Sequence, residues 1–212
     1  MHFCKDIFLS SPGVAVSSVS LQKRIIGGQN CKDDEWQYHV KVYRYDHTKY
    51  EICGGSLISD QWVLTAAHCW NSDPSWVNEA HVGLHPKRAR KKMYPITQRE
   101  VYRDSNSRYH DIMLLKLPEK TTIRPIKLPD YPPLGSDWLC LTWSGALLQR
   151  AGEKGGVGGD QGDCGGGFVF KNRLYGVCVF TGDPLYALNK PSAFLDVCAY
   201  KKWIDDTINQ KP

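Results

Sequence analysis

Three short segments of the chain carry side chains of the types that nucleophilic catalysis requires. His68 lies at the end of an apolar segment and is followed directly by Cys69. Asp111 stands immediately before the apolar run 112–117, and Cys164 lies in the glycine-rich segment 162–167. Imidazole titrates near neutral pH, and a neighbouring imidazolium lowers the pKa of a thiol. A histidine, an acid and a thiol therefore have complementary chemistry if the fold brings them together.

The elements that must position these side chains are mostly short strands. Alternating or continuous apolar residues, separated by turn residues, predict strands over 38–45, 52–58, 61–67, 112–117, 139–143, 167–171 and 174–180. Only the C-terminal end has helical periodicity, with Tyr200, Trp203, Ile204 and Ile208 on one face. Many short strands and one terminal helix indicate an all-β barrel or sandwich protein.

Composition narrows the class of protein further. The 212 residues include 27 basic and 22 acidic side chains, and the resulting charge of +5 is too mild to demand nucleic acid or a membrane as partner. Eight cysteines indicate disulfides and an oxidising compartment, which predicts secretion. Because no Cys-x-x-Cys pair or His-rich cluster accompanies them, we expect no metal site, and we expect no cofactor.

The N-terminal residues 1–24 differ in character from the rest of the chain. Asp6 and Pro12 interrupt the apolar core that a secretory signal needs, so the segment is an atypical leader or, alternatively, a tail without a role. The dibasic pair Lys23-Arg24 directly precedes Ile25-Ile26-Gly27-Gly28, a motif whose meaning depends on the rest of the chain.

Four motifs together resemble the chymotrypsin/trypsin family of serine proteases. They are Ile25-Ile26-Gly27-Gly28, Thr65-Ala66-Ala67-His68-Cys69, Asp111-Ile112-Met113-Leu114 and Gly162-Asp163-Cys164-Gly165-Gly166, and they occur in the family's order. The resemblance runs from Ile25 to Gln210 and implies two antiparallel six-stranded barrels followed by a C-terminal α-helix. It places the first barrel at about 25–128 and the second at about 129–212, behind a leader or propeptide at 1–24.

The resemblance also assigns catalytic roles. His68 would be the general base and then the general acid, Asp111 would hold its tautomer, and Cys164 would stand at the nucleophile position. Backbone N–H groups of Gly162 and Cys164 would form the oxyanion hole. Cleavage after Arg24 would free the amine of Ile25 to pair with Asp163, as in a zymogen.

Two features depart from the family. Cys164 replaces the family's serine, and the segment 162–166 reproduces the Gly-x-Cys-Gly-Gly signature of viral cysteine proteases with the same fold. The thiol is therefore either an alternative nucleophile or a substitution that disables the site, since sulfur is larger than oxygen and catalysis tolerates misplacement badly. The family spacings are about 45 and 93 residues, against 43 from His68 to Asp111 and 53 from Asp111 to Cys164.

The shortfall of about 40 residues falls between Trp143 and Gly156 and predicts a truncated second barrel. A skipped exon or an incorrect gene model would explain it. By resemblance the specificity pocket includes Gly158, Phe180, Thr181 and Ser192. Gly158 stands where trypsin-like relatives carry the acid that binds Arg or Lys, so trypsin-like specificity is not expected.

The resemblance pairs Cys53 with Cys69 in a disulfide that clamps the histidine loop. It leaves the partners of Cys31, Cys140, Cys178 and Cys198 open, because the usual partner positions are missing or altered.

The run Lys87-Arg88-Ala89-Arg90-Lys91-Lys92 is a solvated loop or, alternatively, a site for a heparin-like polyanion, and no calcium is expected there. The sequence thus predicts a secreted, monomeric, trypsin-like endopeptidase made as a zymogen, with activity impaired by Cys164 and the truncation. The alternative is a non-catalytic homologue that binds a partner. A polypeptide substrate or inhibitor is the expected partner, without nucleic acid or membrane.

Overall fold

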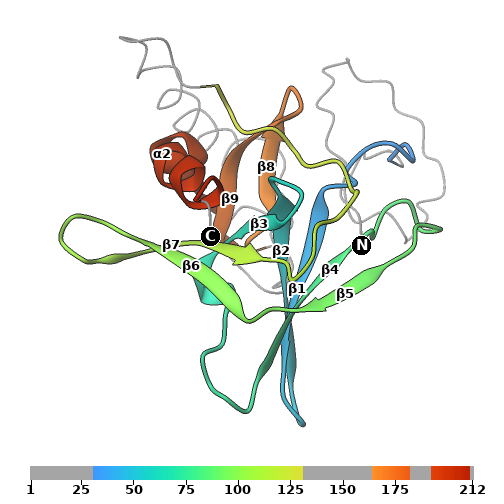
Figure 1. Ribbon diagram of the computed structural model, residues 1–212, viewed down its shortest axis with the longest axis horizontal. Coiled ribbons are helices and arrows are strands. Elements are labelled where there is room, and N and C mark those ends of the chain that lie inside the picture. The colour runs from blue at the N-terminus through green and yellow to red at the C-terminus, as the bar shows by residue number, and fades with distance from the viewer. Residues whose placement is uncertain (1–30, 131–163, 182–191, 211–212) are drawn as a thin grey trace, which may run out of the picture.

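The computed structural model describes residues 31–130, 164–181 and 192–210 (Figure 1). Within these ranges the chain forms two antiparallel sheets, a short 3₁₀ helix and a C-terminal α-helix. The first sheet contains β1 His39–Tyr45, β2 Tyr50–Leu57, β3 Trp62–Thr65, β4 Val77–Val82, β5 Lys92–Pro95, β6 Gln98–Arg103 and β7 Tyr109–Lys116. The second contains β8 Gly167–Phe170, β9 Arg173–Thr181 and β10 Ser192–Asp196, and the helices are η1 Ala67–Cys69 and α2 Val197–Ile208.

The first sheet curls so that its two ends belong to one continuous chain segment. Its strand order is β5-β4-β1-β2-β3-β7-β6, and only Ile96 and Thr97 separate β5 from β6. The same segment therefore pairs with β4 through its first half and with β7 through its second half. Counted as one bent strand, β5 and β6 make this sheet the six-stranded barrel that the family resemblance implies.

The core of the barrel comes from apolar side chains that face inward from most of its strands. Val40 and Val42 are buried and alternate with partly exposed neighbours on β1, as a half-buried strand requires. The strands β3 and β7 pair with Thr65 opposite Met113, and their apolar residues are buried continuously. Fully buried side chains include Leu57, Val63, Leu64, Ile112, Leu114, Leu115 and Leu117.

The second sheet is small and packs against α2 and the barrel. Its order is β10-β9-β8, and Figure 1 shows α2 lying beside β9. Asp196 caps α2 by accepting a hydrogen bond from the backbone N–H of Cys198 at 2.9 Å. The helix buries Val197, Tyr200 and Ile204, which join the same apolar cluster as the barrel residues.

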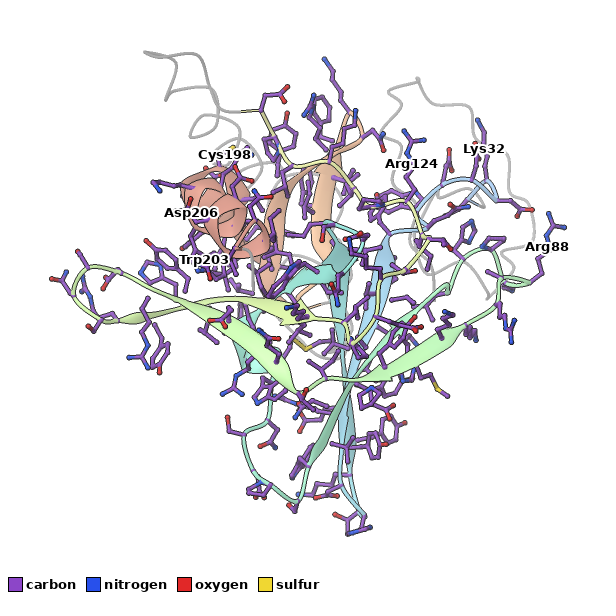
Figure 2. All side chains as sticks on the ribbon, viewed as in Figure 1. Lys32, Arg88, Arg124, Cys198, Trp203 and Asp206 are labelled. Carbon is purple, nitrogen blue, oxygen red and sulfur yellow. A yellow bond between two sulfur atoms is a disulfide. The ribbon has the colours of Figure 1, made fainter. Side chains whose placement is uncertain are left out.

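An aromatic cluster holds the outer part of α2 to the barrel. The ring of Tyr102 on β6 makes edge contacts with Tyr200 and Trp203 of α2, and His110 on β7 accepts or donates a hydrogen bond with the Tyr200 hydroxyl at 2.9 Å. Figure 2 labels Trp203 and Asp206 on this helix. No helix among the described residues is long and apolar enough to cross a membrane.

The predicted all-β fold with a chymotrypsin-like barrel, a reduced second sheet and a C-terminal helix is confirmed. The strands β4, β5, β6 and β10 were not predicted. On β4 the inward position of Asn78 hides the apolar alternation, because this buried amide is satisfied by Asn71 rather than by solvent. The strand predicted over 139–143 lies outside the described residues.

Candidate active site

The histidine loop begins where β3 ends and is held from three sides. Thr65 closes β3, and the 3₁₀ turn η1 then carries His68 and Cys69. A disulfide joins Cys69 to Cys53 on β2, as predicted from the resemblance. From β1, the guanidinium of Arg44 donates to the carbonyl oxygen of His68, and to that of Trp70 at 3.3 Å. The backbone around His68 is therefore fixed by a covalent link and by hydrogen bonds.

Strand register brings Asp111 beside His68. Thr65 pairs with Met113, so the antiparallel ladder places the residues just after Thr65 opposite those just before Met113. Asp111 accepts a hydrogen bond from the backbone N–H of His68 at 2.8 Å, and its other oxygen lies 2.8 Å from Nδ1 of the same residue. This arrangement orients the imidazole and leaves its Nε2 atom pointing away from the acid.

The turn that carries Cys164 is hydrogen-bonded to both sheets. Its carbonyl oxygen accepts from the N–H of Gly54 on β2 at 2.8 Å. The next N–H, that of Gly165, donates to the carbonyl of Cys178 on β9 at 2.6 Å, and the Cys178 N–H donates to Gly166 at 2.9 Å. The turn that carries Cys164 is therefore hydrogen-bonded to the barrel strand that also carries Cys53.

Two glycines allow this close approach. Gly165 has a φ of 83°, and a Cβ there would collide with the carbonyl oxygen of Gly54 and the hydroxyl of Thr65. A Cβ on Gly54 would lie only 2.7 Å from Cα of Gly166. The glycines on the two facing segments thus set the distance between Cys164 and the barrel.

The imidazole of His68 interacts with both of the other side chains. Its hydrogen bond to Asp111 and, next, that to the Cys164 side chain raise its pKa to about 9, against the opposing effect of burial. Burial alone would raise the pKa of Asp111, but hydrogen bonds from the side chain and backbone of His68 outweigh it and lower that pKa. Because the side chain of His68 remains 40% exposed, solvent and ligands can reach it.

The described residues bring together His68, Asp111 and Cys164, and their catalytic roles stay predictions. The predicted oxyanion donor Gly162, the activation residues Arg24, Ile25 and Asp163, and the pocket position Gly158 lie outside the described residues. Ser192, the first residue of β10, pairs with Thr181, the last residue of β9. The preceding residue on β9 is Phe180, which is 54% exposed. The predicted pocket positions on these two strands are therefore neighbours.

The remaining described cysteines differ in state. Cys31 and Cys198 are each in a disulfide whose partner lies outside the described residues. Cys164 and Cys178 carry thiols. The thiol of Cys178 is buried and lies 3.7 Å from the carbonyl oxygen of Phe180. Cys140 is not among the described residues.

The basic run is partly neutralised by nearby acids. Arg88 forms an ion pair with Asp33, and Lys92 pairs with Glu119 at 3.1 Å. Figure 2 shows Arg88 at the same end of the molecule as Lys32. The carbonyl oxygen of Lys32 is hydrogen-bonded to Nε2 of His85. The contacts of Arg88 and His85 thus join this loop to the segment that precedes β1, and Lys92 pairs with a residue that follows β7.

Sequence reasoning missed three residues that support the site. Arg44 holds the carbonyl oxygens of the histidine loop, Gly54 donates to Cys164, and the buried hydroxyl of Thr65 donates to the Gly54 carbonyl at 2.8 Å. Arg44 is one of several polar residues in the alternating pattern of β1, and nothing in that pattern indicates its contact with the histidine loop. The Gly-Gly pair after Cys53 was the only local signal of a close backbone approach.

Comparison with known proteins agrees with this geometry. The family model described as Trypsin matches residues 25–146. Kallikrein 1-related peptidase b21 of Mus musculus is 28% identical over the whole of both chains. Serine protease 1 of Homo sapiens is 30% identical, with 87% of this chain and 90% of that protein covered. A solved structure described as "Structure of GrC" has a TM-score of 0.61 at 23% identity and covers 88% of this chain and 100% of its own.

Proposed function

Because this chain belongs to the trypsin family of serine proteases, we propose that it is an endopeptidase that uses Cys164 as its nucleophile. The observation that carries the proposal is the position of the His68 imidazole, which is hydrogen-bonded to Asp111 on one side and to the Cys164 side chain on the other. A nucleophile, a base and an orienting acid in contact form the minimum group for acyl transfer.

The raised pKa of His68 supports a thiolate–imidazolium pair as the reactive form. The thiolate of Cys164 attacks the carbonyl carbon of the scissile peptide bond. His68 then gives its Nε2 proton to the nitrogen of the leaving amine, and the C–N bond breaks. The products of this step are a free amine, a thioester on Cys164 and a neutral imidazole.

Hydrolysis of the thioester completes the cycle. Neutral His68 takes a proton from water as the water oxygen attacks the thioester carbon, while Asp111 stabilises the imidazolium that forms. Loss of the Cys164 thiolate releases the carboxylic acid product. Backbone N–H groups of Gly162 and Cys164 bind the oxyanion in both steps.

We expect turnover to be slower than in serine relatives. A sulfur atom in a site shaped for oxygen displaces the attacking atom, and misplacement of about 1 Å costs on the order of 100-fold in rate. The missing segment after Trp143 removes part of the second barrel. With Gly158 in place of a pocket acid, cleavage after Arg or Lys is not favoured.

Activation by cleavage and secretion are part of the same proposal. Cleavage after Arg24 activates the chain by freeing the Ile25 amine for Asp163, and the family match supports this because it begins at Ile25. Secretion is supported by the Cys53–Cys69 disulfide and by the disulfides of Cys31 and Cys198.

A non-catalytic homologue that binds a polypeptide is the second candidate. It is favoured by the side chain of Phe180, which is 54% exposed at the end of β9 beside the predicted pocket. An exposed aromatic ring at this place offers a partner an apolar contact without any need for turnover.

Peptide-library hydrolysis by protein cleaved after Arg24 tests the proposal. Cleavage should be lost in Cys164→Ala and after treatment with a thiol alkylator, and Cys164→Ser should restore alkylator-resistant cleavage through the family's own nucleophile. Equal background rates from folded wild-type protein and Cys164→Ala would refute the enzyme and favour the binding protein.

A further inference from the structure

The loop between β4 and β5 carries the densest positive charge among the described residues. Five of the six residues from Lys87 to Lys92 are basic, and Ala89 is the exception. All five basic residues are exposed, and Figure 2 shows Arg88 at the outer edge of the molecule. The proposed peptidase mechanism makes no use of this charge.

Backbone contacts order the loop before any ligand arrives. Lys92 begins β5, which pairs with β4 and closes the loop at its base. The backbone N–H of Ala89 donates to the carbonyl oxygen of Pro86 at 2.7 Å. This bond closes a turn with Lys87 and Arg88 at its corners. Because the backbone is already ordered, binding a ligand there costs less conformational entropy.

Nearby acids neutralise only part of the charge. Arg88 pairs with Asp33, and Lys92 pairs with Glu119 at 3.1 Å. All four of these side chains are more than half exposed to solvent. Ion pairs between such exposed groups are weak, so a ligand with many negative charges can compete for both cations.

The other three cations of the loop are available directly. Within the described part of the chain, no carboxylate forms an ion pair with Lys87, Arg90 or Lys91. A protein cation that takes the place of the counterions condensed on a linear polyanion gains affinity from their release. These three side chains therefore supply most of the charge that such a ligand can use.

We propose that the loop of residues 87–92 is a docking site for a sulfated polysaccharide of the heparin type, whose sulfate groups pair with the exposed cations. Basic runs of this length are typical of heparin and nucleic-acid patches. The Cys53–Cys69 disulfide indicates an oxidising compartment outside the cytosol, which favours the polysaccharide over nucleic acid. The proposal concerns binding and does not depend on peptidase activity.

The composition of the run also favours a polysaccharide over an acidic peptide. The only apolar side chain within residues 87–92 is the methyl group of Ala89. Peptide and protein partners usually bury apolar side chains at the centre of an interface. A highly charged polysaccharide needs no such contact, because its affinity comes from the charges.

Binding of a heparin oligosaccharide, measured by calorimetry at several salt concentrations, tests the site. The triple variant Lys87→Gln, Arg90→Gln, Lys91→Gln should bind about 10-fold or more weakly near physiological salt, because fewer counterions are released. Its affinity should also depend less steeply on salt than that of the wild type. An unchanged affinity in this variant would overturn the proposal.

The matched control removes the same charge from other places. Lys49→Gln, Lys171→Gln and Lys202→Gln together alter exposed lysines on the β1–β2 hairpin, the β8–β9 turn and α2. Each triple variant lowers the formal charge by three, from +5 to +2. The control should keep most of the wild-type affinity. Equal losses in the two variants would show that net charge, and not the loop, binds heparin, which would overturn the proposal.

Competitors test the chemistry of the partner. Desulfated heparin should not displace the oligosaccharide, and single-stranded DNA and polyglutamate should displace it only weakly at the same salt concentration. Either of these two polymers could instead bind the wild type as tightly as heparin and lose affinity in the loop variant. That result would overturn the choice of a sulfated polysaccharide in favour of nucleic acid or an acidic peptide.

Wild-type protein provides a second readout should the variants fold poorly. Heparin should protect Lys87, Lys91 and Lys92 from acetylation of their amines, with mass spectrometry identifying the modified positions. Lys49 and Lys171 should react at the same rate with and without heparin. Equal rates at the loop lysines with and without heparin would contradict the site.

Discussion

The barrel of β1–β7 and the small sheet of β8–β10 contribute unequally to the candidate active site. In the barrel, side chains such as Leu64 and Leu114 are completely buried. In the small sheet every residue of β8 is only half-buried, and Phe180 on β9 is largely exposed. His68 and Asp111 belong to the barrel, while Cys164 directly precedes the small sheet, in which the fully buried side chains are those of β9 such as Leu174.

This difference shows which contacts the site depends on. The His68–Asp111 pair is positioned by strand register and the Cys53–Cys69 disulfide, all within the barrel. The Cys164 turn is hydrogen-bonded to Gly54 of the barrel and also to Cys178 of β9, so both sheets position it. The barrel therefore contacts all three residues of the candidate site.

The largest expected effect is on stability, from a cavity in the barrel. Leu114→Ala should lower the free energy of unfolding by about 2–5 kcal/mol, because Leu114 is fully buried. Phe194→Ala in the small sheet should cost only about 1–2 kcal/mol, since its ring is half-buried and contacts Phe168 at 5.9 Å. Urea unfolding of both variants measures the difference, and equal losses would show that the two regions are packed alike.

A smaller loss of stability is expected from Gly165, where the Cys164 turn meets the barrel strand β2. Gly165→Ala should cost at least about 1–3 kcal/mol, because Gly165 has a φ of 83° and its Cβ would meet the Gly54 carbonyl. Gly83→Ala is the matched control, with a φ of 69° and a Cβ contact of 2.7 Å to Arg90. Both should lose stability in urea unfolding. Only Gly165→Ala should also change the alkylation rate of Cys164, and a similar change in Gly83→Ala would contradict this role of Gly165.

The smallest effect is the pH dependence of stability that His68 contributes. Its folded pKa of about 9, raised first by Asp111, lies above the ordinary value of 6.5. This contribution is therefore complete below pH 6.5 and is lost as the pH rises through about 9. Unfolding at pH 6 and pH 9.5 should show a smaller alkaline loss in Asp111→Asn than in wild type. An equal alkaline loss of stability in Asp111→Asn and wild type would mean that a group other than His68 causes the pH dependence.

Much of the barrel could be predicted from the sequence, and so could the grouping of His68 with Asp111. The apolar runs before His68 and after Asp111 define β3 and β7, and the motif order links them to a known family. The supporting contacts were less accessible, because the bonds of Arg44 to the histidine loop and of Gly54 to Cys164 join segments far apart in sequence.

If His68 holds Cys164 as a reactive thiolate, the pH profile of Cys164 alkylation will show a lowered thiol pKa. Iodoacetamide modification, mapped by mass spectrometry, should reach its half-maximal rate well below the ordinary thiol pKa of about 8.5. His68→Ala should move the profile back to that range, with the buried Cys178 as an internal reference. A wild-type profile centred near pH 8.5 and unaffected by His68→Ala would show that His68 does not stabilise a thiolate at Cys164.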